Sequence, residues 1–363
     1  MRALRYYGKG DIRLEDVPAP ACAPDEVRVK VAYCGICGSD LHEYTGGPIF
    51  PPAPGERNPY TGVELPVIMG HEMCGTIAEL GAGVTGFSVG QNVAVIPAMD
   101  DRHHGYAQCR SCLAGRPNIC KRTTYYGLNA NGGGFSEEIC VKTFALVVLP
   151  EDVPLRRAGL VEPLAVAWHM IRISGYQPND TVAVIGAGPI GCALTFLLKA
   201  QGARAVIVSE ISPARSQQAA VSGADRVVNP LGAAPGAQDP VLTAVQEFAE
   251  DGVDVAFDAC GLQATLVTAI ACTRPGGVVF NVAIHDKPLS VDLMSLTLTE
   301  KKLMGGICYT REDFEAVVEV LSKTGEEAEK LITSVVPLEQ VIEGGFLELI
   351  NNTASHVKIL IKV

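Results

Sequence analysis

Gly186, Gly188 and Gly191 have the spacing of a loop that binds the diphosphate of a dinucleotide. The loop lies between an apolar run and a pattern that is typical of a helix. In such a loop the first glycine forms the turn, the second admits the pyrophosphate, and the third lets the helix pack on the strand. The segment therefore predicts a dinucleotide site formed by Gly186, Gly188, Pro189, Ile190 and Gly191.

An acidic residue follows where a ribose-binding side chain is expected. Glu210 lies 19 residues after Gly191, at the end of the apolar run 205–209. Its charge would bind ribose hydroxyls and repel a 2′-phosphate, which favours NAD over NADP. Arg215 leaves NADP open, because a nearby cation could meet a phosphate or stack near the adenosine.

The cysteines form a second group of reactive side chains. The chain has 12 of them, and Cys109, Cys112 and Cys120 lie close together in the sequence. The N-terminus has charges but no apolar segment typical of a secretion signal, so disulfides are not expected. The cysteines are therefore predicted to bind metal or to be buried thiols.

The elements that must position these residues follow two patterns. Residues 1–150 are interpreted as strands broken by glycine and proline, which favours antiparallel sheet. From about Val161, buried strands alternate with helical patterns, as in a doubly wound parallel sheet. The segment 229–240 is predicted to be a surface loop because it is rich in proline, glycine and alanine. A strand over 302–308, a helix over 311–322 and a terminal strand over 357–363 complete the expected order.

Length and composition restrict the possible functions. With 363 residues, two domains are expected, and 48% hydrophobic with 19% charged residues predicts compact folding. Lys and Arg number 29 against 40 Asp and Glu, a net charge of −11 that argues against nucleic-acid binding. The uncharged run 181–198 is interrupted by glycines, so it predicts a strand, turn and helix, not a membrane span. We therefore expect a cytoplasmic protein that does not bind membranes.

Three further segments contain residues that could bind a metal: 34–42 (CGICGSDLH), 70–72 (GHE) and 162–169 (EPLAVAWH). Spacing alone does not unite them. In order, they resemble signature segments of the zinc-dependent medium-chain dehydrogenase/reductase family, and the resemblance extends essentially from end to end. It is strongest to the 2,3-butanediol and sorbitol dehydrogenase branch, through the runs CGSDLHEYTGGPIFPP and NPYTGVELPVIMGHE.

The resemblance implies a fold, an activity and a partner. The fold is α/β, with a GroES-like β-rich catalytic domain (1–157 and 309–363) and a Rossmann doubly wound parallel sheet (158–308). The activity is zinc-dependent hydride transfer between NAD(H) and a secondary alcohol or vicinal diol, or its ketone, as for 2,3-butanediol and acetoin. Members of the family are commonly homodimers or homotetramers, so self-association is expected.

The resemblance also assigns roles to residues. Cys37 and His71 would bind the catalytic zinc, with Glu162 in place of the second cysteine of alcohol dehydrogenases and Glu72 as a neighbouring carboxylate. Three protein ligands leave one position open for the substrate oxygen. Zinc then lowers the pKa of the alcohol, so that hydride can leave its carbon.

Ser39 and His42 occupy the positions that form a proton relay in relatives, and the imidazole suits this role because its pKa lies near neutrality. Ser39 could equally cap a helix at Asp40.

The spacing of Cys109, Cys112 and Cys120 resembles the structural zinc lobe of the family, but Tyr106 stands where the fourth cysteine is expected. A closed site needs four ligands. Either the lobe is empty and has free thiols, or a nearby histidine or carboxylate completes it, and His103 or His104 is the sharper hypothesis. The upstream residues that could serve are Asp100, Asp101, His103 and His104.

Two other functions remain open from the sequence. A specialised reductase of a larger ketone, iminium or conjugated carbonyl could use the same scaffold. The proline-rich segment 51–58 keeps that possibility open, although a rigid structural loop explains it more simply. A non-catalytic NAD-binding protein would be expected to lose residues of the metal site. The residues of the catalytic metal site are present. The only feature that supports a non-catalytic protein is Tyr106, which stands where a cysteine is expected.

Overall fold

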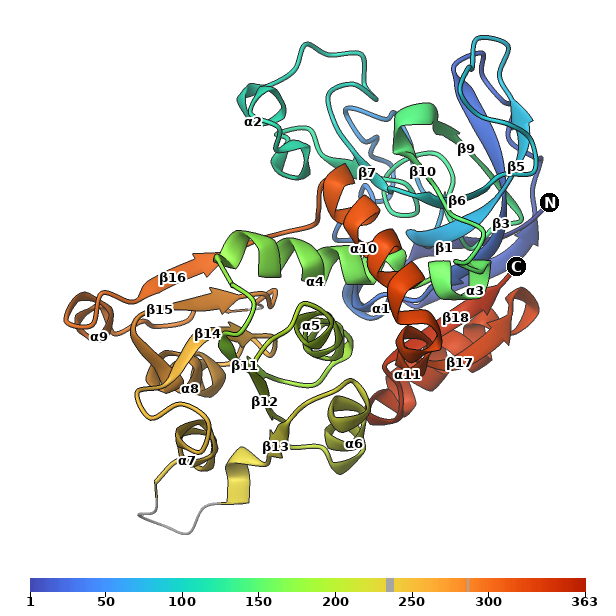
Figure 1. The fold of residues 1–363 in the computed structure, drawn as a ribbon. Coiled ribbons are helices and arrows are strands. Elements are labelled where there is room, and N and C mark those ends of the chain that lie inside the picture. Colours follow the sequence, from blue (N-terminus) through green and yellow to red (C-terminus); the bar gives the residue numbers. More distant parts are fainter. Residues whose placement is uncertain (233–237, 286) are drawn as a thin grey trace.

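Two large sheets organise the part of the chain that the computed structural model describes, residues 1–232, 238–285 and 287–363 (Figure 1). The first sheet contains strands from the N-terminal part of the chain and from its C-terminal end. The strands of the second sheet come from the part of the sequence between these two regions. The strands are β1 (Arg2–Gly8), β2 (Asp11–Asp16), β3 (Glu26–Gly35), β4 (Val67–Ile68), β5 (Glu72–Leu80), β6 (Asn92–Val95), β7 (Ala98–Met99), β8 (Thr124–Tyr125), β9 (Glu138–Lys142), β10 (Leu146–Val148), β11 (Thr181–Ile185), β12 (Ala205–Ser209), β13 (Arg226–Val228), β14 (Val253–Asp258), β15 (Thr273–Asn281), β16 (Lys302–Gly305), β17 (Ile332–Pro337) and β18 (Lys358–Lys362).

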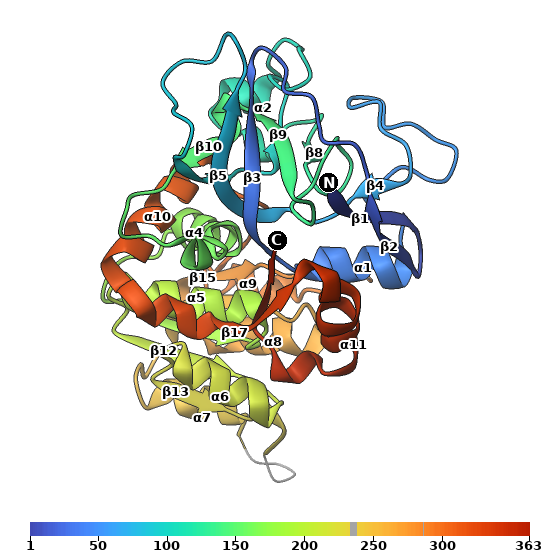
Figure 2. The same ribbon diagram turned by 90° about the vertical axis from the view of Figure 1, so that its right-hand side faces the viewer.

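The first sheet joins the two ends of the chain. Its order is β10-β6-β5-β3-β18-β17, and β9 also pairs with β3. Val27, Val29 and Val31 alternate inward along β3, which is the period-two pattern of a strand with one face in the core. The C-terminal strand β18 runs antiparallel to β3, with Leu360 opposite Gly35. Figure 2 shows the C-terminus at the lower end of β3.

The second sheet is parallel throughout, in the order β13-β12-β11-β14-β15-β16. Every residue of β11 and β12 is buried, as expected where helices cover both faces. The predicted doubly wound parallel sheet is confirmed. The helices are α1 (Gly38–Gly46), α2 (Arg110–Leu113), α3 (Leu155–Ala158), α4 (Val161–Ser174), α5 (Pro189–Ala200), α6 (Pro213–Val221), α7 (Pro240–Gln246), α8 (Gln263–Cys272), α9 (Leu293–Thr297), α10 (Arg311–Thr324) and α11 (Glu348–Asn351).

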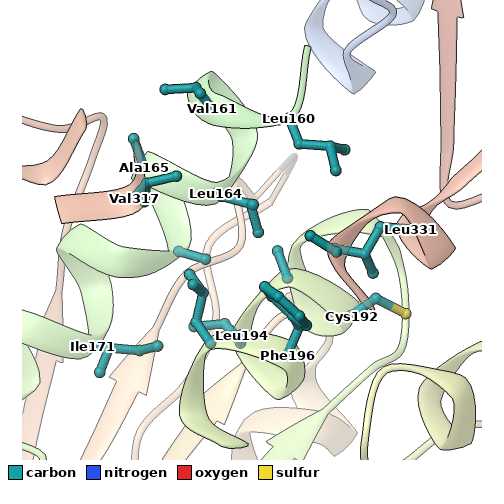
Figure 3. Close-up of a cluster of buried hydrophobic side chains, with 14 of the residues drawn as sticks. Leu160, Val161, Leu164, Ala165, Ile171, Cys192, Leu194, Phe196, Val317 and Leu331 are labelled. Atoms are coloured by element: carbon teal, nitrogen blue, oxygen red, sulfur yellow. The ribbon is translucent and has the colours of Figure 1, made fainter. Parts of the chain in front are cut away.

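The helix α4 packs into a buried cluster that reaches both sheets. Figure 3 shows Leu164 of α4 and Leu194 and Phe196 of α5 gathered together with Leu331. The same cluster includes Cys74 of the first sheet and residues of the second. Because α4 is fixed by this continuous packing, its first turn has a defined position beside the first sheet.

A buried polar contact ties α10 to α4. Asp313 accepts hydrogen bonds from His169 (2.8 Å to Nδ1) and from Arg172 (2.7 Å from Nε). Burial disfavours the charged carboxylate, but the hydrogen bonds from His169 and Arg172 more than offset this and hold the pKa of Asp313 below its usual value.

The other expected elements are placed as follows. The expected strand over 302–308 is shorter, since β16 ends at Gly305, and the helix over 311–322 extends to Thr324. In the expected loop 229–240, a short 3₁₀ helix spans Pro230–Gly232, while residues 233–237 lie outside the described part. The domain borders at 157/158 and 308/309 stay predictions. Within the described residues, no helix combines the length and the apolar character that crossing a membrane requires.

Candidate functional site

Cys37, His71 and Glu72 come together at the end of β3 and the start of β5. Their potential ligand atoms all lie within 4.8 Å of one another. The pairing of Gly35 with Glu72 brings these distant segments together. A Cβ at position 35 would lie 2.0 Å from Glu72 Oε2, so the approach requires a glycine. A thiol, an imidazole and a carboxylate in this arrangement suit zinc.

Two residues of α1 hold His71. Ser39 Oγ lies 3.2 Å from His71 Nε2, and Asp40 Oδ1 lies 3.5 Å from Nδ1. The other oxygen of Asp40 accepts a hydrogen bond from the Cys37 amide at 2.9 Å. Asp40 is fully buried, and its carboxylate fixes the Cys37 amide and lies beside the imidazole of His71. A carboxylate behind an imidazole is a common arrangement at metal sites.

The helix contacts also separate the two roles considered for Ser39. Asp40, not Ser39, satisfies the amide at the start of α1, while the Ser39 hydroxyl contacts the imidazole of His71. His42 is exposed one turn further along α1. Residues three apart share one side of a helix, so Ser39 and His42 can lie along one path.

Lys358 pairs with Glu72 in the interior. Its Nζ lies 2.6 Å from each oxygen of Glu72 and donates to the carbonyl of Ile36 at 3.0 Å. Both side chains are buried. Burial alone would lower the pKa of Lys358, but the charge of Glu72 raises it above its usual value. Glu72 is therefore fixed by a cation from the last strand.

Glu162 lies in the first turn of α4 and is buried beside this group. It is not one of the three residues whose ligand atoms lie within 4.8 Å of one another. Burial, and then the charge of Glu72, raise the pKa of Glu162 to about 7, whereas His71 and Lys358 lower it. The structure thus places Glu162 next to the group without bringing it into the closest set.

The glycine loop connects β11 to α5. A Cβ on Gly191 would lie 1.9 Å from the carbonyl oxygen of Gly186, so the turn requires glycine there. Gly188 and Pro189 begin α5, whose free amides and positive N-terminal dipole suit a phosphate, and Ile190 follows in its first turn. The loop is therefore shaped for the diphosphate that the sequence predicts.

Glu210 is buried against that loop. Its Oε2 accepts a hydrogen bond from the Ala187 amide and its Oε1 one from the Ser212 amide, both at 2.8 Å. Arg215 lies in the first turn of α6, and its buried Nε has no hydrogen-bond partner among the described residues. The assignment of Glu210 and Arg215 to the adenosine ribose of a dinucleotide stays a prediction from the sequence.

The cysteine-rich lobe, residues 100–123, brings a carboxylate to the three thiols. Asp101 joins Cys109, Cys112 and Cys120 in a second group with ligand atoms within 4.8 Å. The hypothesis that His103 or His104 completes this set is therefore wrong for this structure. His103 Nδ1 accepts from the Asp100 amide at 3.0 Å, and His104 Nε2 lies 3.1 Å from the carbonyl of Arg122, so both rings are turned to the backbone.

Sequence analysis did not assign functional roles to Asp40 or Lys358. Asp40 had a local signal, since it stands three residues after Cys37, where a helix-capping carboxylate is common. Lys358 had a weaker one, because a lysine interrupts the inward-facing positions of an apolar terminal strand.

Two protein-family models match this chain. The model described as "Alcohol dehydrogenase GroES-like domain" matches residues 23–151, and "Zinc-binding dehydrogenase" matches residues 189–323. An (R,R)-butanediol dehydrogenase of Saccharomyces cerevisiae is 38% identical over 376 residues, covering 99% of this chain and 98% of the relative. A sorbitol dehydrogenase of Bacillus subtilis is 31% identical and covers 94% of this chain and 91% of the relative.

Solved structures agree with these relatives. The crystal structure of 2R,3R-butanediol dehydrogenase from Bacillus subtilis matches with a TM-score of 0.91 and 37% identity, over 100% of this chain and 99% of that one. An alcohol dehydrogenase from Escherichia coli, solved in complex with NADH, matches with a TM-score of 0.85 and 28% identity over 100% of this chain and 99% of that one.

Proposed function

Because the chain belongs to the zinc-dependent medium-chain dehydrogenase/reductase family, we propose that it interconverts a vicinal diol and its hydroxyketone with NAD(H). The enzyme is a zinc-dependent alcohol or diol oxidoreductase. The observation that carries the choice of substrate is the full-length similarity to (R,R)-butanediol dehydrogenases. 2,3-Butanediol and acetoin are accordingly the substrate pair that we propose.

The residues of the first metal group would hold the catalytic zinc. Cys37 and His71 supply a thiolate and an imidazole. Glu72 already has Lys358 as its partner, whereas among the described residues no lysine, arginine or histidine forms an ion pair with Glu162. We therefore assign Glu162 as the carboxylate ligand and Glu72 as its neighbour. Zinc bound there would act as a Lewis acid that lowers the pKa of the substrate hydroxyl.

Two further groups complete the reaction. The loop 186–191 and Glu210, which share a hydrogen bond, would hold NAD, and the bound coenzyme would supply the acceptor for the hydride of the carbinol carbon. We assign Ser39 and His42 to the relay of the hydroxyl proton, in which the ribose of the bound coenzyme would stand between the Ser39 hydroxyl and the exposed imidazole of His42. Oxidation thus yields the ketone, NADH and one proton.

A substrate panel tests this function. We expect NAD reduction to be fastest with one stereoisomer of 2,3-butanediol, slower with sorbitol and simple secondary alcohols, and slowest with primary alcohols. Initial rates at matched concentrations measure this order. Equal rates with simple secondary alcohols would contradict a diol site. Silence across the panel, in protein that contains zinc and binds NADH, would favour a reductase of a larger carbonyl compound.

Glu210 is expected to set the choice of coenzyme. The change Glu210→Gln removes the negative charge but keeps an oxygen that can accept the Ala187 or Ser212 amide. The ratio of kcat/KM for NADP to that for NAD should rise at least ~10-fold, equivalent to about 1.4 kcal/mol, because repulsion of the 2′-phosphate is lost. Asp225→Asn is the control: it neutralises a carboxylate that pairs with Lys199 and keeps an oxygen for the Val206 amide, so it should leave the ratio unchanged. A constant ratio in Glu210→Gln would remove Glu210 from this role.

We also propose that the protein self-associates through the edge of its parallel sheet. β16 ends the sheet order, and β16 and α9 lie at the left of Figure 1. These two elements and the segments next to them in sequence carry exposed apolar residues: Ile284, Leu293, Met294, Leu298, Leu303 and Ile307. A second copy paired edge to edge would cover them. Sedimentation equilibrium should give a dimer or tetramer, and Leu298→Lys should weaken this association.

We also infer a cytoplasmic location. The unpaired thiols of the described structure support it.

A further inference from the structure

A tyrosine hydroxyl and a cysteine thiol meet between two segments that are far apart in the sequence. Tyr125 Oη, at the end of β8, lies 3.2 Å from Cys308 Sγ, which belongs to the segment between β16 and α10. Either atom can donate the hydrogen bond, and each has lone pairs that can accept another. The two residues are half-buried, so the core does not enclose them fully. The pair therefore offers polar atoms that the steps of the proposed reaction do not use.

Cys308 lies close to the first metal group. Burial is the main cause that raises the pKa of its thiol to about 11, while the hydrogen bond with Tyr125 lowers it. The charges of Glu162, His71 and Cys37 also act on this thiol. Glu162 adds to the raised pKa of Tyr125, for which burial is again the main cause. Because the effect of a charge falls with distance, the pair borders the residues to which we assign the catalytic zinc.

The thiol is held in place by an unusual backbone. Cys308 has a φ of +54°, in the left-handed region that residues with side chains rarely adopt. On one side of it, the Ile307 carbonyl accepts a hydrogen bond from Asn118 Nδ2 at 3.0 Å. On the other side, the Thr310 amide donates to Asp313 Oδ2 at 2.7 Å. Such conformations cost free energy and are concentrated at sites that bind ligands, so the fold maintains a costly position for this thiol.

Contacts on two sides also fix the ring of Tyr125. Its amide donates to Asn129 Oδ1 at 2.7 Å, and the Asn129 side-chain amide donates to the Phe50 carbonyl at 3.3 Å. The Phe50 ring packs edge-on against Tyr125, with centroids 5.9 Å apart and planes at 79°. This geometry is favourable for two aromatic rings. The hydroxyl of Tyr125 thus has a defined position before any substrate binds.

The chemistry of the pair suits an alcohol oxygen. Both groups are uncharged at neutral pH, because burial raises both pKa values. An uncharged hydroxyl and thiol can donate to an alcohol oxygen and accept from it, whereas they give a carboxylate or an ammonium group no opposite charge. Since one substrate oxygen would lie at the metal group, a second oxygen on the neighbouring carbon would lie beside it. In a vicinal diol and in its hydroxyketone, this second oxygen is a hydroxyl.

We propose that Tyr125 and Cys308 bind the substrate hydroxyl that is not oxidised. The metal group and this pair would then fix the substrate at two points. A substrate with a single hydroxyl would leave the pair without a partner and would lose affinity. The proposal rests on the diol function proposed above, and Tyr125 and Cys308 would be the residues that distinguish a diol from a simple alcohol.

The change Tyr125→Phe removes only the hydroxyl and keeps the ring that packs on Phe50. We expect the ratio of kcat/KM for 2,3-butanediol to that for 2-butanol to fall at least ~10-fold, mainly through a higher KM for the diol, because a hydrogen bond to the substrate is lost. The rate with 2-butanol should change little. Tyr126→Phe is the matched control, since it removes the same atom from the adjacent ring in the core of the first sheet and should leave the ratio unchanged.

A binding measurement gives a second readout without turnover. Either 2,3-butanediol or 2-butanol, titrated into the complex of the enzyme with NADH, cannot react, because the alcohol and the coenzyme are both reduced. Calorimetry should show that the wild type binds the diol more tightly than 2-butanol. Tyr125→Phe should lose this difference in affinity, while Tyr126→Phe should keep it.

Cys308 provides further variants if Tyr125→Phe fails to fold. Cys308→Ala removes the thiol and should lower the diol ratio, whereas Cys308→Ser keeps a polar hydrogen and should retain most of the ratio. An unchanged diol preference in folded Tyr125→Phe, or in Cys308→Ala where Tyr125→Phe does not fold, would overturn this proposal alone. The absence of a diol preference in the wild type would contradict the proposed function, and this proposal with it.

Discussion

Replacement of Cys37 by serine is expected to reduce kcat at least ~1000-fold, equivalent to about 4 kcal/mol in the barrier. The serine hydroxyl is a far weaker zinc ligand than a thiolate, so the group formed with His71 and Glu72 loses its strongest donor. The loop 186–191, to which we assign the coenzyme, lies at the other sheet, between β11 and α5. Binding of NADH should therefore persist.

Steady-state rates, fluorescence titration with NADH and zinc content together test this expectation. Cys34→Ser is the matched control: Cys34 is buried three residues earlier, directs its Sγ to the carbonyl of Gly35, and is not part of the metal group. It should retain turnover and zinc. Undiminished turnover in Cys37→Ser would contradict a zinc-dependent mechanism, while loss of both turnover and NADH binding would indicate general unfolding.

Replacement of Lys358 by methionine is expected to lower the free energy of unfolding by about 3 to 5 kcal/mol. The two oxygens of Glu72 would lose the ammonium group that lies 2.6 Å from each, and a carboxylate would be left buried without its partner. Methionine fills similar space, so the loss of charge dominates over loss of packing. Denaturant unfolding, followed by fluorescence, measures the change.

Two variants isolate the ion pair from other effects of this substitution. Lys362→Met makes the same change on the same strand at an exposed position, and it should alter stability by no more than about 0.5 kcal/mol. Adding Glu72→Gln to Lys358→Met should recover part of the loss, because the uncompensated charge is removed. If Lys358→Met were as stable as Lys362→Met, the buried pair would have no structural importance.

The arrangement of the loop 186–191 could be predicted from the local sequence. Its glycines, the following helix and Glu210 belong to one strand–turn–helix–strand unit, and the structure places them together against the same turn. The contact between Glu210 and the Ala187 amide is a consequence of parallel pairing between β11 and β12. Because consecutive elements of such a unit pack on one another, residue spacing was enough to predict it.

Residue spacing alone did not predict which residues come together in the metal groups. The segments around Cys37, His71 and Glu162 were united only by their resemblance to a family. The structure brings the first two together with Glu72 and leaves Glu162 beside them. No short pattern encodes this, since the distances depend on strand pairing and on the packing of α4.

The alternation of apolar runs with helical patterns was enough to predict the parallel sheet, and the glycine spacing was enough to predict the turn between β11 and α5. Which of the potential metal ligands meet depends on the tertiary fold. Lys358 reaches Glu72 across 286 residues of sequence because β18 and β5 flank β3 on opposite sides. Asp101, not His103 or His104, faces the three thiols, and the Cys109 amide and Arg122 hold its carboxylate there. Such contacts depend on strand order and on the path of the backbone, which local residue spacing does not specify.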